Sequence, residues 1–429
     1  MKKRLKLLSL ILAITLTFSS CSLFKQSVTD LVEPPLLRND QKEIISVLQK
    51  EAGQSVVLEY PAKGNNISPF ITRDFDKDGS DEVVAFYSTD NAERVKVAYL
   101  RKQEGKWGLV FSKDGAGNSV VKADTISFKN VGANNLIVGF TVSGTEDTLI
   151  VYDLDRSGEE LCSAEFTDYQ IVSMGSAIRE SFVVFKLFTD GAVKKQTVSY
   201  YSFATDGNSL LDSFTGETVS VSYLNMAAQV LPDFSAFIYV DSLVNNAVMT
   251  EVFKITDGKI SVARSQGFER NTGVYCTDID GDGYPEIPSV VPYSVNTEGL
   301  EEKNILGLIG WFKISGDNLE KVCDSAVNHN LGYILRLPER FENRIILTSN
   351  EAGNLLSAYV YTGDTEKKGT EVFTVKVLYK GDESDTQGYS KIYEGKSIVF
   401  YAKVNNKIYD IDKNLEISYD ELKECLIVL

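Results

Sequence analysis

The chain has 429 residues, with 60 acidic residues against 44 basic ones and a formal net charge of −16. Four of the basic residues lie within the first 20 positions, and the rest of the chain has a net charge of about −20. This charge excludes nucleic acid as a partner and excludes anionic lipid as an electrostatic one. It is typical of a soluble exterior domain that collects cations.

The first 20 residues predict an export signal rather than a part of the fold. Four basic residues within positions 2–6 precede an apolar run over residues 7–18. That run is too short and wrongly flanked for a stable membrane span. Residues 21–37 contain two consecutive prolines and little periodicity, which predicts a tether in front of the domain.

The end of the signal, Phe18-Ser19-Ser20-Cys21, resembles the lipobox of bacterial lipoproteins. The resemblance implies cleavage before Cys21 and a diacylglycerol on its sulfur, which would attach the chain to a membrane. It therefore implies a place in the bacterial cell envelope, on the extracytoplasmic face of that membrane. Phe18 departs from the aliphatic residue that is usual at its position. The alternative is an ordinary signal peptide with an incidental cysteine.

A short N-terminal helix is predicted over residues 38–53. Asp40 can cap its start, Glu43 completes a capping-box-like pair, and Gly53 can end it. Its one apolar stripe contains Ile44, Val47 and Leu48. Such a helix is expected to pack on the domain and to plug or cover it.

Residues 54–429 are predicted to form a β domain. Short runs rich in Val, Ile, Tyr and Phe alternate with polar residues. Polar turns recur at intervals of 47 to 58 residues, at Gly105, Gly158, Gly207, Gly258, Gly316, Gly363 and Asn414. A period of about fifty residues with about four strands per unit is what a β-propeller blade needs. The sequence therefore predicts an all-β fold, a β-propeller of about seven blades, with six or eight left open. A long pair of β-sandwiches is the alternative.

The C-terminal residues 418–429 predict a short capped helix that packs on the last blade instead of closing the ring as a strand. Four cysteines follow the signal, at Cys162, Cys276, Cys323 and Cys425. Their spacing contains no zinc pattern. The sequence leaves open whether any two of them form a disulfide or all remain buried thiols.

Two nine-residue acidic loops are the most informative motif of the chain. Residues 74–82 and 278–286 both fit the pattern D-x-D-x-D-G-x-x-E, and both run into strand-like residues. Calcium takes six to eight oxygen ligands in a flexible shell, and alternate carboxylates in a tight turn point inward together. The sequence therefore predicts two calcium sites. Because protein atoms would fill each shell, their role is expected to be structural.

The predicted ligands take the same places in both loops. Three aspartates would give one oxygen each, the residue after the glycine would give its backbone carbonyl, and the glutamate would give two oxygens. The first set is Asp74, Asp76, Asp78, Ser80 and Glu82, and the second set is Asp278, Asp280, Asp282, Tyr284 and Glu286. An EF-hand is excluded, because it needs a glutamate at loop position 12, where Ala85 and Ser289 stand.

These loops resemble the calcium loops of FG-GAP and VCBS repeats, as in integrin α-chain propellers. The layout of the whole chain is also similar to that of VCBS-repeat lipoproteins of bacteria. The resemblance implies a β-propeller, often on a cell surface, that binds proteins or glycans. Glutamate at the ninth position, Glu82 and Glu286, departs from the family's aspartate, which puts the affinity for calcium in doubt.

The sequence contains no familiar catalytic motif. It has no G-x-S-x-G elbow, no H-E-x-x-H motif and no phosphate-binding glycine loop, and its one histidine, His329, lies in a polar stretch. We therefore expect a binding or scaffold module for an unknown protein or glycan ligand, without catalysis. A carboxylate-dependent glycan-active enzyme on the same fold and an accessory lipoprotein of an envelope complex are the alternatives. A deep axial pocket with two facing carboxylates would favour the enzyme.

Overall fold

The computed structural model describes residues 39–90, 93–127, 135–142, 146–173, 180–202, 210–264, 268–270, 273–291, 306–315, 318–363, 369–382 and 385–429. Cys21, with the predicted signal and tether, lies outside the described residues, as do the predicted turns at Gly207 and Gly316. No helix of the described part is long and apolar enough to cross a membrane.

The described strands form six antiparallel sheets. The first sheet contains β1 (Val56–Leu58), β2 (Phe70–Arg73), β3 (Glu82–Thr89), β4 (Lys96–Gln103) and β5 (Lys106–Asp114). The second contains β6 (Ser119–Ile126), β7 (Asn135–Thr141), β8 (Thr148–Asp153) and β9 (Glu159–Glu165). The third contains β10 (Asp168–Val172), β11 (Ser181–Asp190), β12 (Val193–Tyr201) and β13 (Leu210–Glu217).

The remaining sheets continue this order along the chain. The fourth contains β14 (Ser222–Val230), β15 (Ala236–Val244), β16 (Ala247–Thr256) and β17 (Lys259–Arg264). The fifth contains β18 (Ile287–Val291), β19 (Leu308–Ser315), β20 (Asn318–Asn328), β21 (Tyr333–Leu337) and β27 (Leu426–Val428). The sixth contains β22 (Ile345–Ser349), β23 (Leu355–Val360), β24 (Glu371–Tyr379), β25 (Ser390–Glu394) and β26 (Ile398–Val404). The helices are α2 (Asn39–Ala52), α3 (Tyr419–Cys425) and the short 3₁₀ turns η2 (Glu339–Phe341), η3 (Ile408–Asp410) and η4 (Lys413–Leu415).

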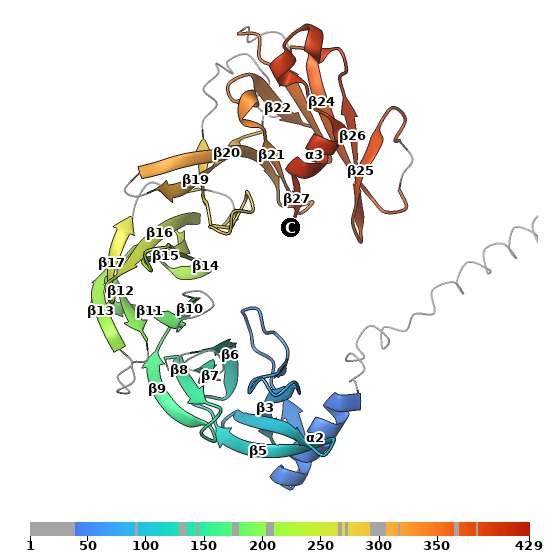
Figure 1. Ribbon diagram of the computed structural model, residues 1–429. Coiled ribbons are helices and arrows are strands. Elements are labelled where there is room, and N and C mark those ends of the chain that lie inside the picture. Colours follow the sequence, from blue (N-terminus) through green and yellow to red (C-terminus); the bar gives the residue numbers. More distant parts are fainter. Residues whose placement is uncertain are drawn as a thin grey trace, which may run out of the picture.

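The six sheets follow one another around an arc, with the first and the sixth at its two ends (Figure 1). The strands β6, β10 and β14 begin their sheets and lie on the concave side, whereas β9, β13 and β17 lie on the convex side. Successive four-stranded antiparallel units of this kind are the blades of a β-propeller. The predicted all-β propeller fold is confirmed. Its described residues form six sheets, the lower count that the turn pattern leaves open.

The seventh predicted turn does not belong to a blade. Gly105, Gly158 and Gly258 lie in hairpins between consecutive strands, with φ values of 77°, 71° and 74°. Asn414 lies instead in η4, where its backbone N–H donates to Asp412 Oδ1 at 2.9 Å. An aspartate that bonds the backbone two residues on favours a turn over a strand ladder. The acidic run before Asn414 therefore resembles a hairpin end in sequence without forming one.

The inner sheets are apolar on both faces because a neighbouring sheet covers each face. In β7, Leu136 packs in the core that is shared with the first sheet, whereas Ile137 packs in the core shared with the third. In β15, Ile238 faces the third sheet and Tyr239 faces the fifth. Successive side chains of a strand point to opposite faces. Central strands therefore read as continuous apolar runs.

The helix α2 covers the outer face of the first sheet. Ile44 and Leu48, one turn apart, are 2% and 0% exposed and pack with Val83 and Ala85 of β3. Gly53 follows the helix with a φ of 65°, a conformation that glycine adopts without strain. The predicted N-terminal helix thus packs on one blade through its apolar stripe.

The C-terminal segment contains both a helix and a strand. The N–H of Glu421 donates to the Ser418 side chain at 3.1 Å and caps α3, as the sequence predicts. Leu422 packs in the core that the fifth and sixth sheets share. The chain then continues as β27, which pairs with β21 through Ile427 and Ile334. The end of the chain therefore adds a strand to the fifth sheet, which the sequence pattern does not predict.

Replacing Leu48 by alanine should lower the free energy of unfolding by about 2–5 kcal/mol, because it leaves a cavity between α2 and the first sheet. Urea denaturation followed by circular dichroism measures this loss. The neighbouring exposed residue provides a matched control, since Gln49→Ala should change the stability by less than about 0.5 kcal/mol. Equal losses in the two variants would contradict the packing of α2 on the sheet.

Candidate functional site

The two acidic loops have the same local structure. In each loop one oxygen from every aspartate lies within 4.8 Å of the others, in the sets Asp74, Asp76, Asp78 and Asp278, Asp280, Asp282. Backbone N–H groups fix the first aspartate, from Gly79 to Asp74 Oδ2 at 3.0 Å and from Gly283 to Asp278 Oδ2 at 2.9 Å. These glycines have φ values of 91° and 87°. The structure therefore brings the six predicted aspartates together as two triads.

The predicted glutamates lie beneath the triads and are fully buried. Glu82 Oε2 accepts the Phe75 N–H, and Glu286 Oε2 accepts the Ile279 N–H, both at 2.8 Å. Among the described residues, Oε1 of each glutamate has no hydrogen-bond donor. A buried carboxylate oxygen without a partner is costly, and a cation would satisfy it. The groups of both loops thus fit a calcium ion, while calcium binding by the aspartates, the glutamates and the Ser80 and Tyr284 carbonyls stays a prediction.

The two loops differ in charge. In the first, Arg101 Nη2 lies 2.8 Å from Asp76 Oδ2 and supplies a positive charge of its own. In the second, no basic side chain of the described part pairs with a loop carboxylate. Burial first, and then the charges of the loop aspartates, raise the pKa of Glu286 to about 7, against the lowering effect of the Ile279 N–H. The second loop therefore has the greater need for a cation.

A polar cavity of about 300 Å³ lies between the first strands of the second, third and fourth sheets. Residues 63–65, which connect β1 to β2, complete its wall. Its polar lining consists of Lys63, Asn65, Lys122, Asp124, Asp168, Tyr169, Gln170 and Asn225. We call this cavity the inner pocket, because β6, β10 and β14 lie on the concave side of the arc (Figure 1).

Two irregularities of the inner strands lie next to the inner pocket. The register of β6 against β7 shifts between Val120 and Lys122, and that of β14 against β15 shifts between Tyr223 and Asn225. Such bulges change the direction of side chains and are frequent near active sites. Lys122 and Asn225, which follow the two shifts, both line the inner pocket.

Two lysines hold Asp168 as an ionised carboxylate. Lys63 Nζ lies 2.7 Å from Asp168 Oδ2, and Lys122 Nζ lies 3.0 Å from Oδ1. Each ammonium also donates to one backbone carbonyl, that of Thr167 at 3.2 Å and that of Tyr169 at 2.8 Å. An ammonium has three N–H groups, so one remains on each lysine. Burial alone would raise the pKa of Asp168, but the charges of Lys122 and Lys63 bring it below its usual value.

The pKa of Asp124 is shifted in the opposite direction, upward. Its Oδ2 accepts the Tyr169 hydroxyl at 2.9 Å, and its Oδ1 accepts Asn66 Nδ2 at 3.3 Å. Burial raises the pKa of Asp124 above its usual value, although Tyr169, Lys122 and Asn66 favour the ionised form. The inner pocket therefore contains two carboxylates whose pKa values are shifted apart. Such pairs are characteristic of acid–base sites.

Neither carboxylate of the inner pocket stands out in the sequence. Asp124 and Asp168 belong to different sheets, and no short motif surrounds either of them. The only sequence signal is a charged residue at a strand position that the fold turns toward the concave side. His329, the one histidine, is exposed between β20 and β21 and is not part of the lining of the inner pocket.

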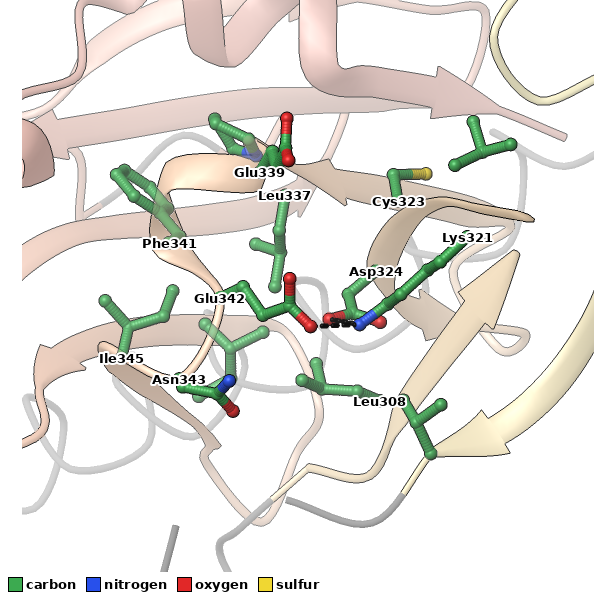
Figure 2. A pocket seen from close by; sticks show the side chains of 14 residues that line it. Leu308, Lys321, Cys323, Asp324, Leu337, Glu339, Phe341, Glu342, Asn343 and Ile345 are labelled. Carbon is green, nitrogen blue, oxygen red and sulfur yellow. Dashed lines mark hydrogen bonds and ion pairs between the residues drawn. The ribbon is translucent and has the colours of Figure 1, made fainter. Parts of the chain in front are cut away.

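A second cavity, of about 250 Å³, lies between the fifth and sixth sheets (Figure 2). Lys321 Nζ lies 2.8 Å from Asp324 Oδ2 and 2.7 Å from Glu342 Oε1, so these charges largely satisfy one another. Burial raises the pKa of Cys323 to about 12, which keeps its thiol protonated and unreactive. Cys276, Cys323 and Cys425 are free thiols. This cavity contains no activated group comparable to Asp124.

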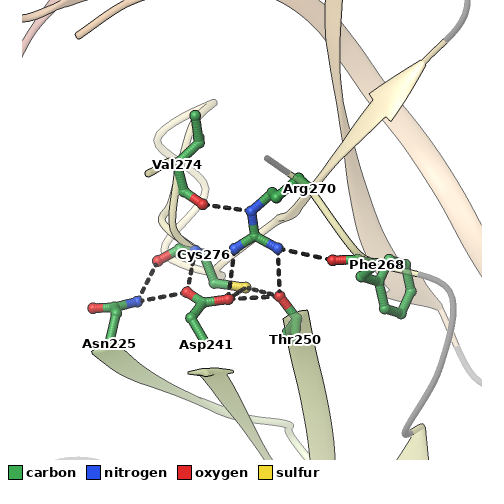
Figure 3. Close-up of polar contacts among 7 residues, drawn as sticks. All are labelled: Asn225, Asp241, Thr250, Phe268, Arg270, Val274 and Cys276. Atoms are coloured by element: carbon green, nitrogen blue, oxygen red, sulfur yellow. Dashed lines mark hydrogen bonds and ion pairs between the residues drawn. The ribbon is translucent and has the colours of Figure 1, made fainter. Parts of the chain in front are cut away.

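A buried polar cluster joins the fourth sheet to the segment before the second acidic loop (Figure 3). Arg270 Nη2 lies 2.7 Å from Asp241 Oδ1, and both side chains are 0% exposed. Arg270 Nη1 donates to Thr250 Oγ1 at 2.8 Å, and Asp241 Oδ2 accepts the Cys276 N–H at 2.7 Å. The residue after Cys276 forms a β-bridge with Glu286. The cluster therefore fixes the start of the loop to β15 and β16.

No protein-family model matches the chain, and no curated protein matches it. Among solved structures, it is similar to the periplasmic gluconolactonase PpgL of Pseudomonas aeruginosa, with a TM-score of 0.32 and 10% identity over 74% of this chain and 95% of that one. It is also similar to a putative 6-phosphogluconolactonase from Bacteroides uniformis, with a TM-score of 0.32 and 13% identity over 71% of this chain and 94% of that one.

Both of these proteins are named as lactonases, which are enzymes, and this contradicts the expectation of a binding or scaffold module without catalysis. The prediction relied on the absence of short motifs, and an active site can be formed by residues that are far apart in the sequence. At such low TM-scores and identities, neither structure indicates a substrate or a catalytic residue for this chain. The resemblance to FG-GAP and VCBS repeats stays a prediction.

In metal-free protein, Glu286 should make the fold less stable as the pH rises. Its pKa in the folded state is about 7, above the usual 4.5, so the folded protein keeps a proton that the unfolded chain releases earlier. This stabilisation is complete below about pH 4.5 and is lost as the pH rises through about 7. Urea denaturation in a chelator, at several pH values between about 5 and 8, measures the slope.

The variant Glu286→Gln should flatten this slope, and calcium should restore stability to the wild type at about pH 8. Glu320→Gln, at an exposed position of the same sheet, is the matched control and should keep the slope. An unchanged slope in Glu286→Gln would show that another group is responsible.

The buried ion pair predicts an asymmetric response to mutation. Arg270→Met should cost about 3–5 kcal/mol of unfolding free energy, because it leaves the Asp241 carboxylate buried and unpaired. The double variant Arg270→Met with Asp241→Leu should recover part of the loss. Arg344→Met, which breaks an exposed pair with Asp412, should cost much less, because water screens such a pair. Thermal or chemical denaturation measures both losses. Equal losses of unfolding free energy in Arg270→Met and Arg344→Met would contradict this prediction.

Proposed function

We propose that this chain is a carboxylate-dependent hydrolase that acts on an ester of a sugar in the inner pocket. The observation that carries the proposal is the opposite shift of the Asp124 and Asp168 pKa values in one cavity. The amide and carboxylate side chains of the lining suit a polyhydroxylated ligand. Ile171, Leu224 and Met226 add apolar surface, which suits the carbon face of a sugar ring.

The charges of the inner pocket select the type of reaction. Two ammonium groups, on Lys63 and Lys122, stand beside one firmly ionised carboxylate, on Asp168. Cleavage of a glycosidic bond develops positive charge on the sugar ring, which nearby ammonium groups disfavour. Addition of water to an ester carbonyl develops negative charge on oxygen, which preorganised donors stabilise. The arrangement therefore favours ester hydrolysis.

In this mechanism Asp124 is the general base. Its raised pKa makes it a stronger base than an ordinary aspartate. It takes a proton from a water molecule, whose oxygen adds to the ester carbonyl carbon. The remaining N–H groups of Lys63 and Lys122 are the donors for the oxyanion. The C–O bond to the alcohol then breaks, and Asp124 returns the proton to the departing alkoxide. Asp168 keeps the two ammonium groups in place.

The proposal includes two bound calcium ions with a structural role and a lipid anchor at Cys21. The aspartate triads and the buried glutamate oxygens that accept no hydrogen bond from the described residues support the calcium sites. The lipobox-like segment before Cys21 supports an anchor on the extracytoplasmic face of a membrane in the bacterial envelope. In this view calcium stiffens the blades, and the reacting groups all come from the inner pocket.

The test is hydrolysis of O-acetylated methyl glycosides by the full chain, measured as acetate release. Asp124→Asn should lower kcat/KM by about 100-fold or more, because it removes the general base. The wild-type rate should rise with pH through the pKa of Asp124, since the base must be ionised, and this limb should vanish in the variant.

Asp190→Asn provides the matched control. Asp190 also pairs with a lysine, at 2.6 Å from Lys195 Nζ, but on the exposed surface of the third sheet. This variant should keep the full rate. An Asp124→Asn variant that hydrolyses the glycosides as fast as Asp190→Asn would exclude Asp124 as the base. Failure of the wild type on every ester would exclude the hydrolase.

A further inference from the structure

We infer that Asn225 recognises a hydroxyl group of the substrate through its side-chain carbonyl oxygen. The substrate class is then a polyhydroxylated ester whose free hydroxyl faces the fourth sheet. The inference rests on the proposed function, because Asn225 lines the same inner pocket. It adds a residue that determines specificity to the residues that carry out the reaction.

The orientation of the Asn225 amide is set by its partners. Its nitrogen donates to Asp241 Oδ2 at 3.0 Å and to the Cys276 carbonyl oxygen at 3.1 Å. A side-chain amide has two N–H groups, so both are used. Both partners are acceptors, and a reversed amide would place oxygen against oxygen. Figure 3 shows Asn225 with its nitrogen toward these partners and its oxygen on the side away from Asp241.

The Asp241 side chain, which accepts the hydrogen bond from Asn225, is itself held in place. It is 0% exposed, and its Oδ2 also accepts the backbone N–H of Cys276. Its Oδ1 accepts from Arg270 at 2.7 Å and from the Thr250 hydroxyl at 2.5 Å. A rotation of the Asn225 amide would leave buried acceptors unpaired, which is unfavourable. The cluster therefore presents the Asn225 oxygen as a fixed acceptor.

The two sides of the inner pocket then differ in hydrogen-bonding character. Lys63 and Lys122, on the side of the second sheet, have N–H groups left to donate. Asn225, on the side of the fourth sheet, has a carbonyl oxygen that can only accept. A ligand that spans β10 must offer an acceptor to the lysines and a donor to Asn225. A sugar ester has both groups, in its carbonyl oxygen and in a free hydroxyl.

The experiment compares O-acetylated methyl glycosides with matched deoxy analogues that each lack one hydroxyl. For wild type, removal of one particular hydroxyl should lower kcat/KM roughly tenfold or more, the effect of one unmade hydrogen bond. In Asn225→Leu, kcat/KM for the parent ester should fall by a similar factor. The ratio of kcat/KM for the parent ester to that for the deoxy ester should then approach one. Asn318→Leu, the same change at an exposed position of β20, should keep the wild-type ratio.

The outcomes separate this inference from the proposed function. If the wild type hydrolyses every deoxy ester as fast as its parent, Asn225 does not recognise a substrate hydroxyl. The inference is then overturned, while the proposed hydrolase activity is confirmed. If Asn225→Leu keeps the wild-type ratio of kcat/KM between parent and deoxy ester, another residue recognises the hydroxyl and the inference is overturned. If wild type hydrolyses no ester, the proposed function fails first.

Should Asn225→Leu not fold, a crystal structure of the wild type with the parent methyl glycoside decides. A ligand hydroxyl within hydrogen-bond distance of Asn225 Oδ1 supports the inference, and a bound ligand without this contact overturns it.

Discussion

A single sheet of this protein cannot bury both of its apolar faces, and the rest of the structure depends on that constraint. In β11, Phe182 and Val184 pack toward the second sheet, whereas Val183 and Phe185 pack toward the fourth. Every such strand needs a neighbouring sheet on each side, because apolar area that stays in water contributes no stabilisation. Face-to-face packing along the chain satisfies this need for the inner sheets. The first sheet lacks a preceding blade, and α2 instead covers its free face with Ile44 and Leu48.

Once the sheets are stacked, their first strands have an edge on the concave side, and polar groups can gather there without disturbing the cores. β6, β10 and β14 each bring part of the inner pocket, and two register shifts lie beside it. The pocket is polar while the sheet interfaces behind it are apolar, as a binding site on a rigid scaffold requires. Burial raises the pKa of both Asp124 and Asp168, and the values separate because two ammonium partners bring only that of Asp168 below its usual range. The proximity of the two carboxylates therefore follows from the stacking of the sheets.

Local patterns in the sequence predict what local structure decides. The aspartate triads could be predicted because each lies within nine consecutive residues. The blades could be predicted because hairpin turns recur with a regular period. The turn at Asn414 misleads for the same reason, since its acidic run looks like a hairpin end but caps a 3₁₀ turn. Asp124 and Asp168 could not be paired from sequence, because they meet only after two sheets have packed. The absence of catalytic motifs was therefore no evidence against catalysis, and the prediction of a module without it was wrong.

The buried cluster around Asp241 links the two features that the sequence and the fold provide separately. One carboxylate oxygen accepts both from Asn225, which lines the inner pocket, and from the backbone of Cys276, which leads into the second acidic loop. A displacement of the loop would therefore be transmitted to the pocket through the side chain of Asp241, which its other hydrogen bonds hold in place. Breaking either bond leaves Asp241 buried with fewer donors, a cost that low local polarity makes large. A cation that fixes the loop would on this account also fix the wall of the pocket, without touching the substrate.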